Sequence, residues 1–249
     1  MLTPEEKQRY DRQIMIPSIG ETGQEKLKKA RVVIAGSGGL GSPISLYLAA
    51  AGIGTLRIID NDKVELSNLN RQILYWEKDI GKYKTDSAEI KLRQLNKNIT
   101  VETINTTIDE SNVSELVAGF DVIVDAMDNL PTRFLLNKAA VEHQIPFIHG
   151  AVSGLDGRAM TVIPGKTACL QCLYHSVPPK AKFPVLGTTP AIIGSIQATE
   201  VIKYLTGIGT LLTNRLLMYD GLNMEFTELQ VARFKDCECC GKLKLEDKT

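Results

Sequence analysis

Residues 32–62 read VVIAGSGGLGSPISLYLAAAGIGTLRIIDND, and this stretch decides the fold. The apolar run at residues 32–35 is typical of a strand that is buried on both faces of a parallel sheet. Residues 40–51 predict a helix, and residues 56–59 predict a second strand. The stretch is therefore expected to form a strand, a glycine turn, a helix and a second strand that ends at Asp60.

The turn between the first strand and the helix has the spacing of a nucleotide-binding loop. Gly36, Gly38 and Gly41 follow the pattern G-x-G-x-x-G. Glycines allow a tight turn and close approach of a ligand, and the N–H groups at the start of the next helix favour phosphate. Asp60 can accept hydrogen bonds from ribose hydroxyls. The sequence therefore predicts a nucleotide site, and this pattern alone first suggests a nicotinamide or flavin enzyme.

Composition excludes several classes of protein. A chain of 249 residues suits one large α/β domain, or one with an appended subdomain. Its 29 Lys and Arg balance its 29 Asp and Glu, and no basic stripe indicates nucleic-acid binding. The uncharged residues 32–56 contain glycines and a predicted helix that is shorter than the ~20 residues of a membrane span. Because the N-terminus is also too charged for a signal peptide, we expect a soluble, cytoplasmic protein.

A polar loop with several cations follows the second strand. Residues 61–88 read NDKVELSNLNRQILYWEKDIGKYKTDSA and include Arg71, Lys82 and Lys84. Loops at the carboxyl ends of the strands line the ligand crevice of an open α/β sheet. Cations in this place can neutralise a triphosphate. The alternative is a solvated loop without a ligand.

Further along the chain, predicted strands and helices alternate, which indicates a mostly parallel sheet. Strands are expected at residues 100–106, 120–126 and 146–151. Helices are expected at residues 3–9, 85–96, 109–117 and 131–142. Beyond Gly157, one buried helix is expected at residues 192–205. The remaining strands, expected as antiparallel additions to the same sheet, lie at residues 158–163, 216–219 and 224–231.

Asp128 and Asn129 near the predicted crevice can bind a ligand or cap a helix, whereas Arg12 lies before the nucleotide-binding unit. Asp128 and Asn129 follow the strand at residues 120–126 and therefore lie at the crevice edge. Asp128 can hold Mg²⁺ or the adenosine side of a ligand, and an Asp or Asn here can also cap the helix that follows. Arg12 precedes the first strand, and its residue type alone favours a solvated surface arginine.

The cysteines form two C-x-x-C pairs far apart in the chain. Cys169 pairs with Cys172, and Cys237 pairs with Cys240. Two such pairs can supply a tetrahedral Cys₄ site for Zn²⁺ that ties distant segments together. A redox C-x-x-C is the weaker alternative. Cys239 is expected to be a spare thiol. A metal-binding pair of Cys237 and Cys239 is the alternative, and its spacing is less common among ligands.

No catalytic triad is recognisable among the histidines. His143, His149 and His175 are scattered, and a lone histidine is more often structural than catalytic. His175 lies in a loop rich in Pro and Lys, residues 174–187, that could cover a site.

Eight motifs in order resemble the E1-like activating enzymes of the ThiF/MoeB/HesA family. They are RYDRQI, AGSGGLGSP, IIDNDKVELSNLNRQ, GKYKTDSA, DAMDN, CLQC, GSIQATEVIKYLTG and CECC. The resemblance covers nearly the whole chain. It implies a Rossmann-like, mostly parallel sheet that is extended by antiparallel strands, flanked by helices and joined to a Cys₄ zinc site. The expected organisation is a single adenylation domain at residues 1–249, with a helical arm at 1–30, a nucleotide-binding half at 31–155 and a carrier-binding, zinc-bearing half at 156–249.

The resemblance also implies an activity. The family binds ATP with Mg²⁺ and adenylates a carboxylate, usually the C-terminal glycine of a ubiquitin-like sulfur carrier of the ThiS or MoaD kind, with release of pyrophosphate. Adenylation of a small-molecule carboxylate in cofactor biosynthesis is the first alternative. An NAD-dependent oxidoreductase and a non-catalytic binding subunit are remote ones. Many relatives have a cysteine between the first C-x-x-C and the buried helix, but residues 173–195 contain none, so a later cysteine step is in doubt.

Site residues follow from the same resemblance, position by position. The expected catalytic residues are Arg12, which reaches the other subunit of a homodimer, and Arg71, Lys84 and Asp128. The expected zinc ligands are Cys169, Cys172, Cys237 and Cys240. The expected nucleotide-binding residues are Gly36, Gly38, Gly39, Gly41, Asp60, Asp62, Asn68, Arg71, Gln72, Lys84, Asp128 and Asn129.

Overall fold

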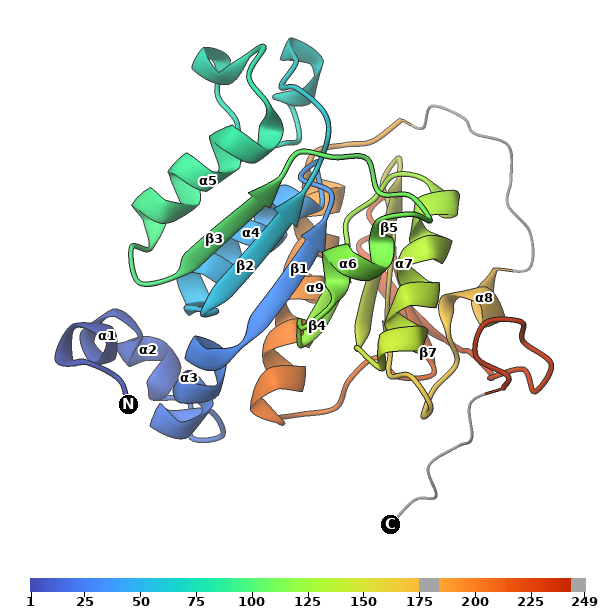
Figure 1. Cartoon of the computed structure of the whole chain (residues 1–249). Helices are drawn as coiled ribbons and strands as arrows, with labels where there is room; N and C mark the ends of the chain where they lie inside the picture. The colour runs from blue at the N-terminus through green and yellow to red at the C-terminus, as the bar shows by residue number, and fades with distance from the viewer. Residues whose placement is uncertain (175–183, 243–249) are drawn as a thin grey trace.

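The computed structural model describes residues 1–174 and 184–242, and this part forms one eight-stranded sheet with helices on both faces (Figure 1). The strands are β1 (Arg31–Ala35), β2 (Thr55–Ile59), β3 (Thr100–Ile104), β4 (Val122–Asp125), β5 (Phe147–Ser153), β6 (Asp156–Val162), β7 (Arg215–Asp220) and β8 (Glu225–Gln230). Their order is β3-β2-β1-β4-β5-β6-β7-β8. Strands from β3 to β5 run parallel, and β6, β7 and β8 are added antiparallel. This confirms the predicted fold class.

The helices alternate with the parallel strands as expected. They are α1 (Pro4–Arg9), α2 (Asp11–Ile14), α3 (Gly20–Lys29), α4 (Gly41–Ala51), α5 (Lys84–Leu95), α6 (Val113–Val117), α7 (Leu130–His143), α8 (Leu170–Leu173) and α9 (Thr188–Thr206). Two short 3-10 turns, η1 (Leu66–Asn68) and η2 (Glu77–Asp79), lie in the loop after β2. Within residues 1–174 and 184–242, no helix is both long and apolar enough to span a membrane.

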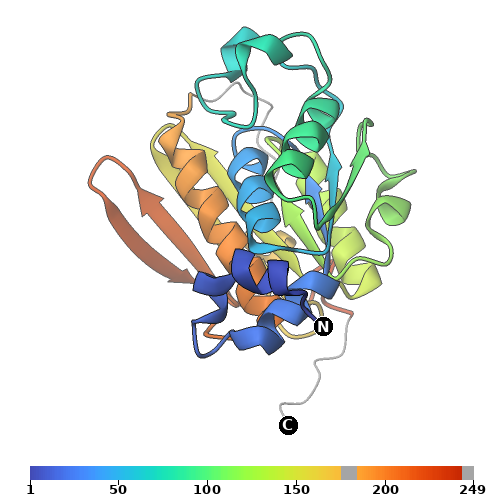
Figure 2. The same ribbon diagram turned by 90° about the vertical axis from the view of Figure 1, so that its left-hand side faces the viewer.

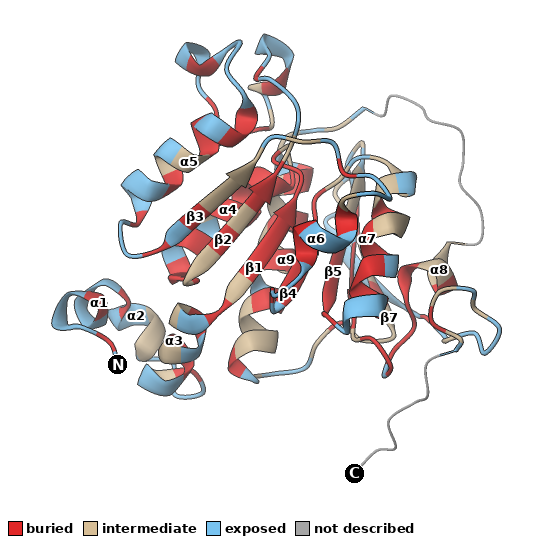
Figure 3. Cartoon of the chain, viewed as in Figure 1, coloured by how far each residue is buried: buried red, intermediate tan, exposed pale blue. Residues whose placement is uncertain are grey.

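The apolar run that predicted β1 fills two separate cores. Side chains of a strand alternate between the two faces of a sheet. Val32 and Ile34 pack in the core beneath α4, α5 and α9, whereas Val33 and Ala35 pack in the core beneath α6 and α7. All four residues are fully buried, as are most residues of the central strands (Figure 3). The central sheet is therefore covered on both sides.

Two helices begin four residues away from their predicted starts. The predicted helix at residues 109–117 begins only at Val113, because the Asp109 carboxylate accepts hydrogen bonds from the backbone N–H and hydroxyl of Ser111 and holds a turn there. The helix predicted at residues 192–205 begins earlier, at Thr188, because Pro190 is tolerated in a first helical turn.

The helical arm lies at the opposite end of the sheet from the glycine loop. The backbone N–H groups of Gly54 and Thr55, at the start of β2, donate to the carbonyls of Leu27 and Ala30 at the end of α3 (both 3.0 Å). Figure 1 shows α1, α2 and α3 beyond the amino ends of β1 and β2. The arm is therefore far from the carboxyl edge, where parallel sheets bind their ligands.

Candidate active site

Two glycines in the loop between β1 and α4 have no room for a side chain. Gly36 has a φ of +97°, and a Cβ there would lie 2.6 Å from the carbonyl oxygen of Ala126. A Cβ on Gly41 would lie 2.1 Å from the carbonyl oxygen of Gly36. Both positions therefore need glycine for the chain to turn from β1 into α4.

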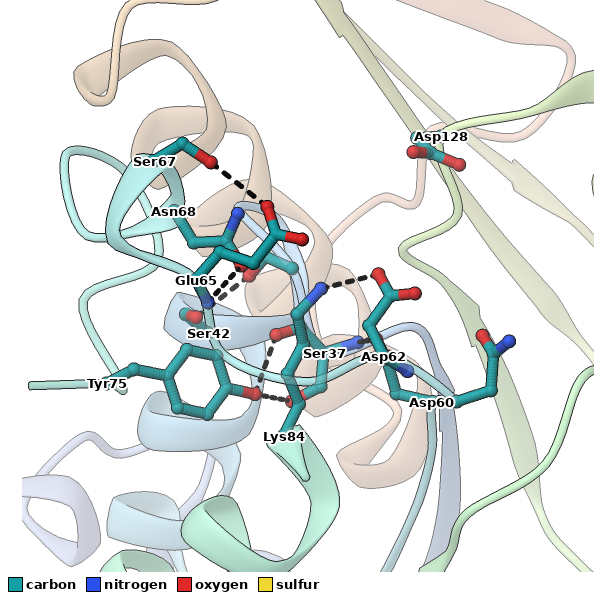
Figure 4. Close-up of polar contacts among 12 residues, drawn as sticks. Ser37, Ser42, Asp60, Asp62, Glu65, Ser67, Asn68, Tyr75, Lys84 and Asp128 are labelled. Atoms are coloured by element: carbon teal, nitrogen blue, oxygen red, sulfur yellow. Dashed lines mark hydrogen bonds and ion pairs between the residues drawn. The ribbon is translucent and has the colours of Figure 1, made fainter. Parts of the chain in front are cut away.

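Two side chains from later segments anchor this loop at Ser37. The Asp60 Oδ2 atom accepts a hydrogen bond from the Ser37 N–H (2.7 Å), and Asp60 Oδ1 accepts one from the Asp62 N–H (2.8 Å). The buried Tyr75 hydroxyl donates to the Ser37 carbonyl (2.8 Å) and lies 2.5 Å from the Ser37 hydroxyl (Figure 4). Burial raises the pKa of Tyr75, so this phenol stays neutral. Sequence reasoning missed Tyr75, because no local pattern marks it.

The predicted cations lie at the same edge of the sheet. Lys84 begins α5, and its Nζ lies 2.7 Å from Asp62 Oδ2, although only 4% of Lys84 is exposed. Burial raises the pKa of Asp60, whereas the positive charge of Lys84 acts in the opposite direction. Arg71 donates to the carbonyl of Ser67 (2.9 Å). The structure therefore brings one half-buried acid and two cations to the predicted crevice.

The residues around Arg71 face the open part of the glycine loop. A Cβ on Gly38 would meet only Gln72 Nε2, at 3.7 Å, and a Cβ on Gly39 would lie 3.7 Å from Arg71 Cγ and 3.2 Å from Pro190 in α9. Gln72 is buried, and its Oε1 has no hydrogen-bond partner in the described part of the chain. Buried polar groups usually have partners, so this atom is available to a ligand.

Asn68 has a local contact as well. It is buried in η1, and its Oδ1 accepts a hydrogen bond from the Glu65 N–H (3.2 Å). Lys82, which the sequence also predicted as a crevice cation, is exposed, and its Nζ lies 3.7 Å from Asp79 Oδ1. Asn68 therefore stabilises the loop that carries Arg71, and Lys82 pairs with an acid of that loop.

Asp128 stands apart on the loop between β4 and α7. Its side chain is exposed, and Figure 4 shows it separated from the group around Ser37 and Asp60. The cap of α7 is Asn129, whose Oδ1 accepts the Thr132 N–H (3.0 Å). The helix is therefore capped by Asn129, whose Nδ2 also donates to Asp128 Oδ1 (3.4 Å), and the exposed Asp128 carboxylate can still meet a ligand.

Arg12 is the one predicted catalytic residue that does not lie at the carboxyl edge of the sheet. It lies exposed on α2, in the arm beyond the amino ends of the strands. Arg12 makes no hydrogen bond or ion pair to the residues that the structure describes. Its own crevice is at the other end of the sheet, so a role in catalysis requires a second subunit.

One histidine is buried against an acid beneath the Asp128 loop. His149 Nδ1 lies 2.7 Å from Asp125 Oδ2, and both side chains are completely buried. The carboxylate only accepts hydrogen bonds, so Nδ1 carries the proton. The sequence predicted no partner for His149, because no local pattern links this histidine to β4. The predicted loop at residues 174–187, including His175, lies largely outside the described residues.

Mild acid should destabilise the protein through His149. Burial lowers the pKa of His149, Arg133 and Arg158 act in the same direction, and Asp125 opposes them. Below the unfolded pKa of about 6.5, the unfolded chain takes up a proton that the folded chain excludes. The free energy of unfolding should therefore fall as pH falls below about 6.5, by at most ~1.4 kcal/mol per pH unit. Urea unfolding should show this slope in the wild type and a weaker one in His149→Asn; equal slopes would contradict the assignment.

The four predicted zinc ligands lie close together, although two come from the start of α8 and two from the C-terminal segment. The sulfur atoms of Cys169 and Cys237 are 3.7 Å apart, those of Cys172 and Cys240 are 3.6 Å apart, and all four lie within 4.8 Å of one another. Tetrahedral Zn–S bonds of about 2.3 Å would place sulfurs about 3.8 Å apart. The cluster therefore fits a tetrahedral metal. Cys239 lies beside it, and its Sγ accepts from Asn137 Nδ2 (3.1 Å).

Comparison with known proteins agrees with this geometry. A family model described as the ThiF family matches residues 10–240. The SAMP-activating enzyme E1 of Haloferax volcanii is 43% identical over 240 residues, which cover 94% of this chain and 88% of that protein. The sulfur carrier protein adenylyltransferase of Thermus thermophilus is 41% identical over 250 residues, which cover 96% and 92%. A crystal structure of E. coli MccB with ATP superposes with a TM-score of 0.86 at 28% identity and covers 94% of this chain and 75% of that one.

The sheet order, the anchored glycine loop and the superposition define an α/β enzyme of the E1-like class. The family match and the two relatives above 40% identity show that the chain belongs to the ThiF family. It is an adenylyltransferase, as its relatives are named, which confirms the predicted class of enzyme.

Proposed function

We propose that the chain uses ATP to adenylate the C-terminal carboxylate of a ubiquitin-like sulfur-carrier protein and releases pyrophosphate. One observation carries this proposal. Arg71 and Gln72 lie against the open side of a glycine loop that Asp60 anchors, and Lys84 forms an ion pair with Asp62 two residues further on. A triphosphate needs such cations, whereas a dinucleotide site relies mainly on backbone N–H groups. The names of the two similar relatives, a SAMP-activating enzyme and a sulfur carrier protein adenylyltransferase, support the same substrate class.

The residues at the crevice suit an in-line displacement. The carrier's carboxylate is already a nucleophile at neutral pH, so the site needs no general base for it to attack the α-phosphorus. Arg71 and Lys84 stabilise the negative charge that develops on the departing pyrophosphate, and Asp60 accepts hydrogen bonds from the ribose. The glycine loop fixes the phosphates, so catalysis consists mainly of positioning and charge neutralisation.

Two metals belong to this proposal. Asp128, an exposed carboxylate at the crevice edge, would help to hold Mg²⁺, which supplies further neutralisation of the phosphates. Cys169, Cys172, Cys237 and Cys240 would hold Zn²⁺, which joins the C-terminal segment to the domain. Asn129 caps α7 and so positions its neighbour Asp128.

We also propose a homodimer in the cytoplasm, built from single-domain chains with residues 1–30 as the arm. A hollow of about 350 Å³ lies between α2, α4 and α9 and is lined in part by Gln13, Tyr47 and Ile202. Tyr47 is 58% exposed, and Met15, two residues after Gln13 in the chain, is 63% exposed. Figure 2 shows α4 and α9 side by side above the N-terminal helices. A second copy on this face would bury apolar surface and bring Arg12 to another chain.

Exchange of radioactive pyrophosphate into ATP tests the proposed function. Exchange should require Mg²⁺ and a ubiquitin-like carrier that ends in glycine, and a carrier without its last glycine is the control. Exchange with a small carboxylate and with no carrier would favour the alternative substrate. No exchange with any carboxylate would overturn the proposal.

Nucleotide choice can be tested without a substrate. ATP with Mg²⁺ should raise the melting temperature, since a ligand that binds only the native state stabilises it by about 2.7 kcal/mol at one hundred times its Kd. NADH should have no effect, because no part of the proposed mechanism uses a nicotinamide. A shift with NADH and none with ATP would contradict the adenylation site and favour an oxidoreductase.

A further inference from the structure

A buried polar cluster lies directly beneath the loop that carries Asp128. Asp125, at the end of β4, lies 2.7 Å from His149 Nδ1 and 3.3 Å from Arg133 Nε, all atoms of buried side chains. Gln197 of α9 donates to the Asp125 carbonyl (2.7 Å). The cluster therefore joins β4, β5, α7 and α9 at one point under the crevice edge.

The cluster holds both polar groups of the residue before Asp128. Asp125 Oδ1 accepts the Met127 N–H (3.0 Å), and Arg133 Nη2 donates to the Met127 carbonyl (2.5 Å). The same Arg133 nitrogen also donates to the Gly150 carbonyl (3.0 Å). On the other side, Asn129 is fixed as the cap of α7. The backbone of Asp128 is therefore held from both sides, while its side chain remains exposed.

Stability alone does not account for this cluster. A buried ion pair gains little net stability over apolar residues of the same volume, because desolvation costs much of the attraction. What such a pair does provide is a defined geometry, through hydrogen bonds to two carbonyls and one N–H. A carboxylate that must face a ligand benefits from a backbone fixed in advance.

We propose that Arg133 and His149 are positioning residues for the adenylation reaction. Arg133 fixes the Met127 carbonyl, and His149 keeps the Asp125 carboxylate in the orientation that accepts the Met127 N–H. Both therefore act through the direction of Asp128, and the inference rests on the proposed role of Asp128 at the nucleotide site.

Three substitutions test the proposal. His149→Asn keeps an N–H donor near Asp125, whereas His149→Leu has a similar size and no donor. Arg133→Lys keeps the charge but cannot bridge the Met127 and Gly150 carbonyls while contacting Asp125. We expect His149→Leu and Arg133→Lys to lower pyrophosphate exchange about 10- to 100-fold, and His149→Asn to recover most of that loss. His143→Asn is the matched control, since the His143 ring lies at the surface, 2.7 Å from Ser114 Oγ and away from the buried cluster, and it should keep wild-type activity.

Combining Arg133→Lys with Asp128→Asn separates a positioning role from a general loss of stability. If Arg133 acts through Asp128, Arg133→Lys should cost no further activity in an Asp128→Asn protein. The same comparison should hold for the magnesium-dependent part of the melting-temperature shift by ATP, which is measurable even in inactive variants. Equal losses in both backgrounds, or an inactive His149→Asn beside an equally inactive His149→Leu, would overturn the proposal. A wild type with neither exchange nor an ATP shift would instead overturn the proposed function.

Discussion

Arg12→Ala should lower the rate of adenylation strongly and leave the fold and the dimer intact. Arg12 lies on an exposed helix at the amino end of the sheet, whereas Asp128 and the glycine loop lie at the carboxyl end. Its guanidinium is therefore expected to act on the ATP of the other subunit. An arginine supplied in trans contributes ~10³-fold or more in other phosphoryl transfers, and we expect less here because Arg71, Lys84 and Mg²⁺ share the charge.

Mixing two inactive variants tests this arrangement directly. Asp128→Ala should also be inactive, because it removes the carboxylate proposed to hold Mg²⁺. A mixed dimer then has one complete site, with Asp128 from the Arg12→Ala chain and Arg12 from its partner. Random exchange of subunits should restore about a quarter of the wild-type activity.

The control is a neighbouring arginine in the same arm. Arg9 donates to the carbonyl of Leu95 in its own chain (3.2 Å), so Arg9→Ala should stay active. If differently tagged subunits are shown to form mixed dimers and activity does not return, then Arg12 does not act across the interface.

Substitution of one proposed zinc ligand should remove the metal, whereas substitution of the neighbouring cysteine should not. The purified protein should contain about one Zn²⁺ per chain. Cys240→Ser should lose most of it and lower the melting temperature, because Cys240 is buried within the cluster, 3.6 Å from Cys172. Loss of a structural metal removes its binding free energy from the folded state.

Cys239→Ser is the matched control, since it changes the adjacent residue. Its thiol accepts a hydrogen bond from Asn137, whose Oδ1 also accepts the Leu170 N–H (2.9 Å). A serine hydroxyl can accept the same hydrogen bond, so metal content should be unchanged. Metal analysis by mass spectrometry gives the answer, and equal loss from both variants would mean that the ligand set is wrong.

Local patterns determined the nucleotide-binding half of this protein. The alternation of apolar runs and helical segments predicted the sheet, because the period of a pattern depends only on neighbouring residues. Gly36 and Gly41 were recognisable for the same reason, since their spacing defines one turn. The two C-x-x-C pairs were also recognisable, because each pair is local and together they complete one tetrahedron.

Only the tertiary structure decided what surrounds these motifs. Tyr75 anchors Ser37 across 38 positions of sequence. Asp125 and His149 are 24 positions apart and meet because β4 and β5 pair in parallel, with Asp125 opposite His149. The position of Arg12 also depends on the tertiary structure. The sheet places α2 at the end opposite the glycine loop, and no spacing in the sequence predicts that separation.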